Sequence, residues 1–175
     1  AELAALSIRN LMDNDPAKLK EIDLLTCGTS VPDQLMPSHG VMVHGELPES
    51  NTIEVISPSG NCCSGMHGFK YAYFSIKLGD AKKAVCCASE RLSRSLHADQ
   101  FELEAKKMGE LEANPYIAFE KDFLRWMLSD GAASFLLEGE KNKNGISLRI
   151  DWIEAYSFAN EIESCMYMGT EKLAD

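Results

Sequence analysis

One stretch, residues 53–94, constrains the fold more than any other. Residues 52–56 alternate β-branched apolar side chains with polar ones, which is the pattern of a strand. Ser-Pro-Ser-Gly at 57–60 ends it, because proline lacks a backbone donor and glycine permits a sharp turn. A helix capped by Asn61 or a neighbour is expected next, and then a second strand over 84–94. The helix is expected to end at Gly79-Asp80, and its apolar residues recur near the helical period: Met66, Phe69, Tyr73 and Ile76.

Cys62 falls where the first strand gives way to the first turn of this helix. Unpaired backbone N–H groups and the helix dipole favour an anion at such a position, so a thiol there ionises readily and becomes a nucleophile. The competing interpretation is an inert residue, because most cysteines are small buried hydrophobic side chains. Position alone favours the inert interpretation, and the surrounding residues favour the nucleophile.

Those surrounding residues resemble two related signatures. Cys62-Cys63-Ser64-Gly65-Met66 is similar to the nucleophile signature of thiolases, and residues 70–94 resemble the β-ketoacyl-ACP synthase III family. In that family a nucleophilic cysteine opens a helix, and the strand that follows finishes in a Ser-Asp or Ser-Glu pair. Ser89-Glu90 fills that place here. The resemblance implies that Cys62 is the catalytic nucleophile, and the motif spacing fits Cys63 less well.

The rest of the chain alternates helix and apolar strand, which is typical of an α/β fold whose sheet is covered on both faces. A loop and a short helix starting near Pro37 are expected over residues 31–48, and a turn over 139–145. The other expected elements are helices over 1–12, 17–20 and 100–112, and strands over 22–26, 134–137 and 146–155.

The resemblance implies two substrate-binding residues. The loop before Pro37 is similar to a family loop near the dimer interface, where a bulky apolar residue reaches into the partner subunit's acyl pocket. Met36 takes that place here, although filling the core is the alternative role for this methionine. Residues 129–133, Ser-Asp-Gly-Ala-Ala, resemble the family's Gly-Asp-Gly-Ala motif. Gly131 is expected to allow close backbone approach there.

The resemblance covers residues 1–156 and implies a thiolase-like fold, which has two similar halves and αβαβα layers. Residues 1–156 are expected to form the amino-terminal half without its first strand, and 157–175 the connection toward a carboxy-terminal half. In the family, the histidine and asparagine that assist decarboxylation come from that second half. We therefore expect the chain to be part of a protein about twice as long, and to be inactive and poorly soluble when expressed alone.

Composition excludes several classes of function. The net charge of −10 argues against nucleic-acid binding. No apolar run approaches the roughly 20 residues that span a bilayer, and no secretory leader is visible, so a cytoplasmic protein is expected. Of the six cysteines, four form adjacent pairs, which favours reduced thiols over disulfides. One basic cluster could be part of a docking patch for an acidic acyl carrier protein or a solvated sheet edge: Lys82, Lys83, Arg91 and Arg94.

None of the four histidines is expected to be catalytic. His39 and His44 lie five residues apart without an acidic third ligand, which predicts structural or surface groups and no metal site. His67 follows Cys62 by five residues on the same helix and is therefore rotated about 140° away from it. His97 stands in a polar stretch with nothing beside it to suggest a role.

The mechanism implied by the resemblance is ping-pong acyl transfer. Cys62 takes an acyl group from a coenzyme A or acyl-carrier-protein thioester, and a malonyl or β-keto thioester then condenses with it. The expected protein is a homodimeric acyltransferase of fatty-acid or polyketide biosynthesis that needs no cofactor. Pro-Ser-His-Gly at 37–40, together with Cys-Cys-Ser-Gly, also resembles the condensing enzymes that build dialkylresorcinols and aryl polyenes. The alternatives are a non-catalytic partner subunit and a binding module with an inert buried cysteine.

Overall fold

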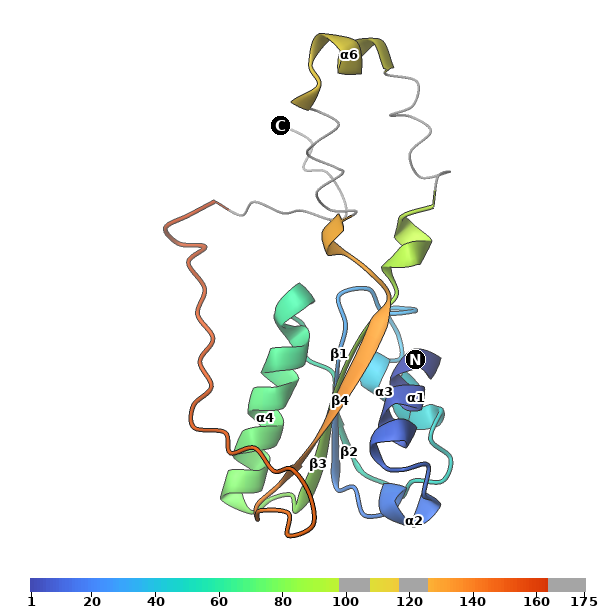
Figure 1. Cartoon of the computed structure of the whole chain (residues 1–175), viewed down its shortest axis with the longest axis vertical. Coiled ribbons are helices and arrows are strands. Elements are labelled where there is room, and N and C mark those ends of the chain that lie inside the picture. The colour runs from blue at the N-terminus through green and yellow to red at the C-terminus, as the bar shows by residue number, and fades with distance from the viewer. Residues whose placement is uncertain (98–107, 117–125, 164–175) are drawn as a thin grey trace.

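A mixed four-stranded sheet forms the centre of the computed structural model, which describes residues 1–97, 108–116 and 126–163. The strand order is β2-β1-β3-β4 (Figure 1). β1 is parallel to both β2 and β3, whereas β4 is antiparallel to β3. The strands are β1 (Leu24–Gly28), β2 (Glu54–Ile56), β3 (Lys83–Glu90) and β4 (Gly131–Glu138).

Helices cover both faces of this sheet (Figure 1). Three lie on one face: α1 (Glu2–Leu11), α2 (Pro16–Leu19) and α3 (His39–Gly45). The opposite face carries α4 (Ser64–Leu78), and α6 (Met108–Ala113) stands apart from the sheet. Single 3₁₀ turns follow two of the strands, η1 (Asn61–Cys63) after β2 and η2 (Leu92–Ser95) after β3. No helix in the described ranges is long and apolar enough to cross a membrane.

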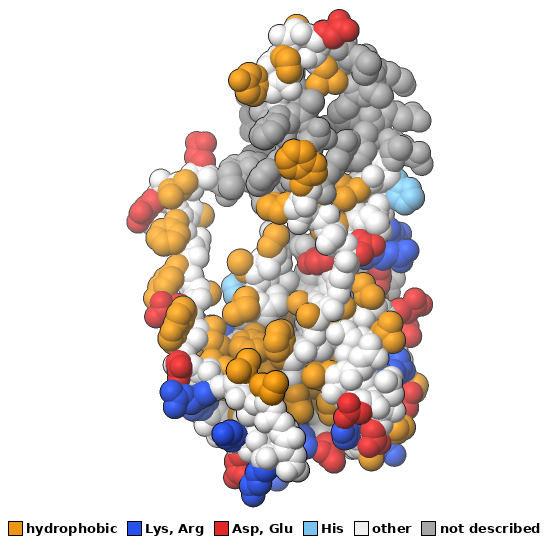
Figure 2. Space-filling model, in the orientation of Figure 1, with side chains coloured by type: hydrophobic (Ala, Val, Ile, Leu, Met, Phe, Trp, Pro, Cys, Tyr) orange, Lys and Arg blue, Asp and Glu red, His pale blue; other side chains and the backbone are white. Residues whose placement is uncertain are grey.

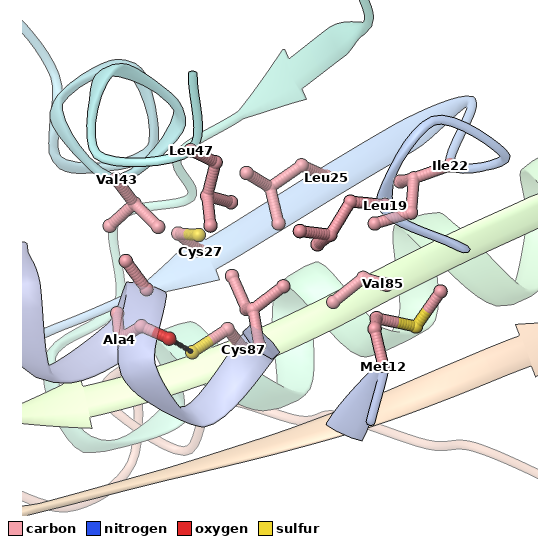
Figure 3. Packing of buried hydrophobic residues seen from close by; sticks show 12 residues of the cluster. Ala4, Met12, Leu19, Ile22, Leu25, Cys27, Val43, Leu47, Val85 and Cys87 are labelled. Atoms are coloured by element: carbon pink, nitrogen blue, oxygen red, sulfur yellow. Dashed lines mark hydrogen bonds between the residues drawn. The ribbon is translucent and has the colours of Figure 1, made fainter. Parts of the chain in front are cut away.

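Each face of the sheet has its own hydrophobic cluster. Successive residues of a strand point to opposite faces, so Cys86 packs toward α4 while Cys87 packs toward α1. The cluster under α4 is built from Leu24, Ala72, Ala81, Ala84, Cys86 and Leu137. Figure 3 shows the cluster on the other face, where α1, α3 and the two central strands meet. Its members include Ala4, Ile8, Met12, Leu25, Cys27, Val43, Val85 and Cys87.

α4 lies very close to the sheet because small residues face each other across the contact. A Cβ added to Gly28 at the end of β1 would lie 2.6 Å from the carbonyl carbon of Ser64. A Cβ added to Gly65 would lie 2.8 Å from the Cβ of Ala88 on β3. Real Cβ atoms do not approach so closely. The start of α4 is therefore fixed against β1 and β3 by backbone contact.

Most of the expected elements are confirmed with shifted ends. The helices expected over 1–12 and 17–20 are present as α1 and α2. The strands expected before and after α4 are present as β2 and β3, and the strand expected after 129–133 is present as β4. α4 ends as expected at Gly79, which takes a left-handed conformation with φ of 77°. The strand expected over 84–94 ends at Glu90, and the chain then forms the 3₁₀ turn η2. α3 begins at His39, two residues after Pro37. Most of the helix expected over 100–112 lies outside the described residues.

The strand expected over 146–155 is wrong. These residues form no strand, and Ile146 is 95% exposed. Alternating side chains make a strand only where a neighbouring edge pairs with its backbone groups. Here the segment passes on the α4 side without pairing, and Ile150 is its one residue packed against the α4 cluster (Figure 1).

Candidate active site

The cysteine turn, which is the name used here for residues 61–63, is a strained connection between β2 and α4. Asn61 has a positive φ of 49°, which asparagine tolerates better than most residues. Cys62 follows within η1, and Cys63 occupies the cap position of α4. No side chain caps either helix, so the expected cap at Asn61 or a neighbour is not formed. Backbone strain of this kind is concentrated at functional sites.

The turn lies at the carboxyl ends of the parallel strands β1 and β3. Gly28 of β1 is paired in register with Ala88 of β3, and the two residues contact the backbone at Ser64 and Gly65. In open α/β sheets, ligands bind outside the carboxyl ends of the strands. Cys62 is exposed at this edge.

Exposure separates the thiols into two groups. Cys62 and Cys63 are exposed, whereas Cys27, Cys86 and Cys87 are buried. Burial raises the pKa of Cys86 to about 11, and its thiol donates to the carbonyl oxygen of Gly65 at 3.5 Å. A hydrogen bond with the Cys87 thiol, together with burial, raises the pKa of Cys27. The inert-cysteine alternative therefore fits these three residues, and Cys62 is not buried.

The Ser89-Glu90 pair at the end of β3 holds the loop that follows β1. The backbone N–H of Ser30 donates to Oε1 of Glu90 at 2.7 Å, and the Thr29 hydroxyl donates to Oε2 at 3.4 Å. The Ser89 hydroxyl is hydrogen-bonded to Nε2 of His39 at 3.0 Å. The sequence motif identified the pair, and the structure shows its contacts.

His39 is a buried group, with 7% of its surface exposed. Burial lowers its pKa, and the amino-terminal charge adds to this effect, while Asp33 and Glu90 oppose it. The sequence predicted a structural or surface group, and the structure shows a buried one. No sequence signal could have revealed the burial, because the Ser89 partner is fifty residues away.

Met36 is an exposed residue of the described part of the chain. It is 84% exposed in the loop between β1 and α3, next to Leu35 at 89%. Met36 therefore does not fill the core formed by the described residues. Its contact with a partner subunit stays a prediction.

Gly131 does not make the expected close approach. It pairs with Glu90 at the start of β4, and among the described residues nothing lies within 4 Å of a Cβ placed on it. The conformation around it is held by Asp130, whose carboxylate accepts from the backbone N–H and hydroxyl of Ser93 at 2.8 and 2.6 Å. These hydrogen bonds lower the pKa of Asp130. A substrate role for Gly131 stays a prediction.

Asp130 also borders a shallow pocket of about 330 Å³ between η2 and the start of β4. No sequence pattern predicted a pocket here. Its lining is Ser93, Leu96, His97, Leu128, Ser129 and Asp130.

The basic cluster is not a single patch. Lys82 and Lys83 lie at one end of β3, and Arg91 and Arg94 follow its other end. Lys83 is paired with Glu21 and Glu138. Because β3 is an interior strand, these residues do not lie on a sheet edge. A role for either pair in docking an acyl carrier protein stays a prediction.

His44 and His67 make local contacts. Nδ1 of His67 donates to the carbonyl oxygen of Ser59 at 3.3 Å, and Nε2 of His44 donates to that of Asn51 at 3.0 Å. Within the described residues, no group of three or more possible metal ligands comes together.

Comparison with known proteins gives related condensing enzymes. No family model matches. β-Ketoacyl-acyl-carrier-protein synthase III 1 of Deinococcus radiodurans is 26% identical over 99 residues, which are 57% of this chain and 29% of that protein. AbyA1, a tetronic acid condensing enzyme, superposes with a TM-score of 0.58 at 16% identity, covering 80% of this chain and 35% of AbyA1. A variant of OleA from Xanthomonas campestris, bound with cerulenin, gives a TM-score of 0.56 at 20% identity over 77% of this chain and 38% of OleA.

The fold is that of the thiolase-like condensing enzymes. Within that class, the resemblance to β-ketoacyl-ACP synthase III read from the sequence is confirmed by the curated relative. The chain spans 29% of the length of that relative, and this partial coverage fits the amino-terminal half.

Proposed function

We propose that this chain is the cysteine-bearing part of a condensing acyltransferase. The observation that carries the proposal is the exposure of Cys62 in a strained turn at the carboxyl ends of two parallel strands. Similarity to a β-ketoacyl-ACP synthase III supports the reaction class.

The proposed reaction has two steps. The Cys62 thiolate attacks the carbonyl of an acyl thioester and expels the coenzyme A or carrier-protein thiol, leaving an acyl-cysteine. A malonyl thioester then loses carbon dioxide, and its carbanion attacks the acyl carbonyl and releases the Cys62 thiolate. A β-keto thioester serves the second step after loss of a proton. The backbone N–H of Cys62 is the proposed donor to the developing oxyanion.

Substrate contacts and assembly belong to the same proposal. Met36 and Gly131 contact the acyl chain, and Met36 does so across the interface of a cytoplasmic homodimer. Coenzyme A or acyl carrier protein delivers the substrates, and neither a cofactor nor a metal takes part. Light scattering that gave a monomer, or a dimer structure with Met36 outside the interface, would overturn the assembly. The histidine and asparagine for decarboxylation are proposed to lie outside residues 1–175.

The test is acylation of the protein by an acyl-coenzyme A, followed by intact-mass and peptide mass spectrometry. We expect one acyl group on the peptide that contains Cys62, and no acyl group on Cys62→Ala. Cys63→Ala is the matched control and is expected to be acylated. Thioester binding without acylation would favour the non-catalytic partner subunit, and no binding would favour the unrelated module.

A further inference from the structure

The loop between β1 and α3 is held at both ends by two consecutive residues of β3. At its start, the backbone N–H of Ser30 donates to Glu90 at 2.7 Å. At its end, His39 is hydrogen-bonded to Ser89 at 3.0 Å. Residues 31–38 therefore form a loop, called the arch below, whose two ends are both held by the carboxyl end of β3.

This arch is connected to the cysteine turn at two places. The chain that leads into the arch leaves the sheet at Gly28, and Gly28 contacts the backbone of Ser64 in the first turn of α4. It re-enters at α3, where the Ser57 hydroxyl accepts from the N–H of Gly40 at 2.7 Å and donates to the Ser38 hydroxyl at 3.1 Å. Ser57 belongs to the segment that leads from β2 into the turn. The arch therefore has fixed contacts on both sides of Cys62.

His39 is an unfavourable choice for stability alone. Its Nδ1 atom is buried and has no hydrogen-bond partner among the described residues. A buried polar atom without a partner keeps its desolvation cost, which an apolar side chain of similar size would avoid. The side chain satisfies one contact only, and that contact fixes the arch.

Two residues within the arch, Leu35 and Met36, have exposed apolar side chains. We propose that His39 is a positioning residue that, through Ser89, fixes the positions of Leu35 and Met36 in the arch and thereby sets the affinity for the acyl chain. The acyl-chain part rests on the proposed function, whereas the positioning of the arch does not.

The positioning is tested by hydrogen–deuterium exchange of the full-length protein. His39→Leu and Ser89→Ala should each speed exchange in peptides from residues 29–38 several-fold, and the double variant no further, because both changes break the same bond. His39→Gln places an amide near the Nε2 position and should restore slow exchange. His44→Leu on the same helix is the control and should leave the arch unchanged.

Unchanged exchange in the arch for both His39→Leu and Ser89→Ala would overturn the positioning. Faster exchange throughout α1 and α4 in both variants, without rescue by His39→Gln, would show a general structural role and also overturn it. If His39→Leu alone fails to fold, Ser89→Ala and His39→Gln still decide between these outcomes.

The acyl-chain part is tested by kinetics with acyl thioesters of increasing length. His39→Leu should raise KM several-fold for the longer chains, with the rate of Cys62 alkylation by iodoacetamide unchanged, and His39→Gln should restore KM. A loosened arch with unchanged KM would overturn this part. A loosened arch in a protein that is never acylated would leave the positioning in place and reject the proposed function.

Discussion

The two faces of the sheet differ in how completely this chain covers them. Among the residues that the structure describes, the hydrophobic cluster on the α1 and α3 face has twelve buried members, including Ile8 with no exposed surface. The α4 face has a cluster of six, and large apolar side chains remain exposed beside it (Figure 2). These are Met66, Phe74 and Leu78 on α4, and Phe135 on β4. We call the α1 and α3 face finished because its cluster is the larger one, although Leu3, Leu6 and Val41 on its helices are also partly exposed. We call the α4 face unfinished because it exposes two phenylalanine rings, which is apolar surface of the kind that marks contacts with further protein.

This difference places the cysteine turn on the unfinished side. α4, which begins directly after the turn, buries its small residues against the sheet and packs Phe69, Tyr73 and Ile76 against the cluster. Its other large apolar residues, named above, remain exposed. The buried side supplies a rigid support, and the outer side is where other groups could reach Cys62. Four measurements test this difference between the faces.

The largest difference is expected in thiol reactivity. Native protein treated with iodoacetamide near neutral pH should be labelled at Cys62 first and Cys63 more slowly. Cys86 and Cys87 should remain unmodified, since they are buried and the pKa of Cys86 is about 11.

Peptide mapping by mass spectrometry reads the result, with Cys165, outside the described residues, quantified as its own peptide. Cys62→Ala is the control and should keep the circular dichroism spectrum of the parent. Labelling of Cys63 ahead of Cys62 would contradict the assignment of the nucleophile.

The second difference is expected in stability. Ile8→Ala on the finished face should lower the free energy of unfolding by about 2–5 kcal/mol, because it opens a cavity in the cluster. Phe74→Ala on the unfinished face should cost less than about 1 kcal/mol, since Phe74 is 48% exposed. Urea denaturation measures both. Equal costs would mean that the α4 face is already covered within this chain.

A third measurement concerns the contact below the turn. Gly28→Ala should cost about 1–3 kcal/mol and displace the start of α4, because the new methyl group would overlap the backbone at Ser64. Gly45→Ala, where a Cβ meets nothing within 4 Å, is the matched control and should be neutral or slightly stabilising. A neutral Gly28→Ala would show that α4 can move away from β1 without cost.

The smallest effect is expected in how the free energy of unfolding depends on pH, through His39 on the finished face. Because the pKa of His39 is lowered from 6.5, the unfolded chain binds this proton more strongly than the folded chain. The resulting stability is present above pH 6.5 and is lost as the pH falls through the folded pKa. His39→Gln should remove this part of the dependence. Urea midpoints at several pH values, with His44→Gln as control, test it, and parallel curves for parent and His39→Gln would contradict it.

Sequence reasoning succeeded where the signal is local. The strand, break and helix around Cys62 follow from residues that are neighbours in the chain, and the structure contains all three. It failed where the answer depends on distant partners. The segment over 146–155 pairs with neither edge strand of the sheet, and His39 is held by Ser89, fifty residues away. The basic residues are close in sequence but separated by the length of β3.

The contact between Gly28, Gly65 and Ala88 also has a mechanical consequence. Two glycines and an alanine leave no rotatable side chain between α4 and the two strands, so nothing there can absorb a small displacement. Any sliding of β1 relative to β3 would therefore be passed to the start of α4 as a whole. The position of the Cys62 sulfur atom therefore follows that of the sheet, and its orientation depends on the stiffness of the backbone at this contact.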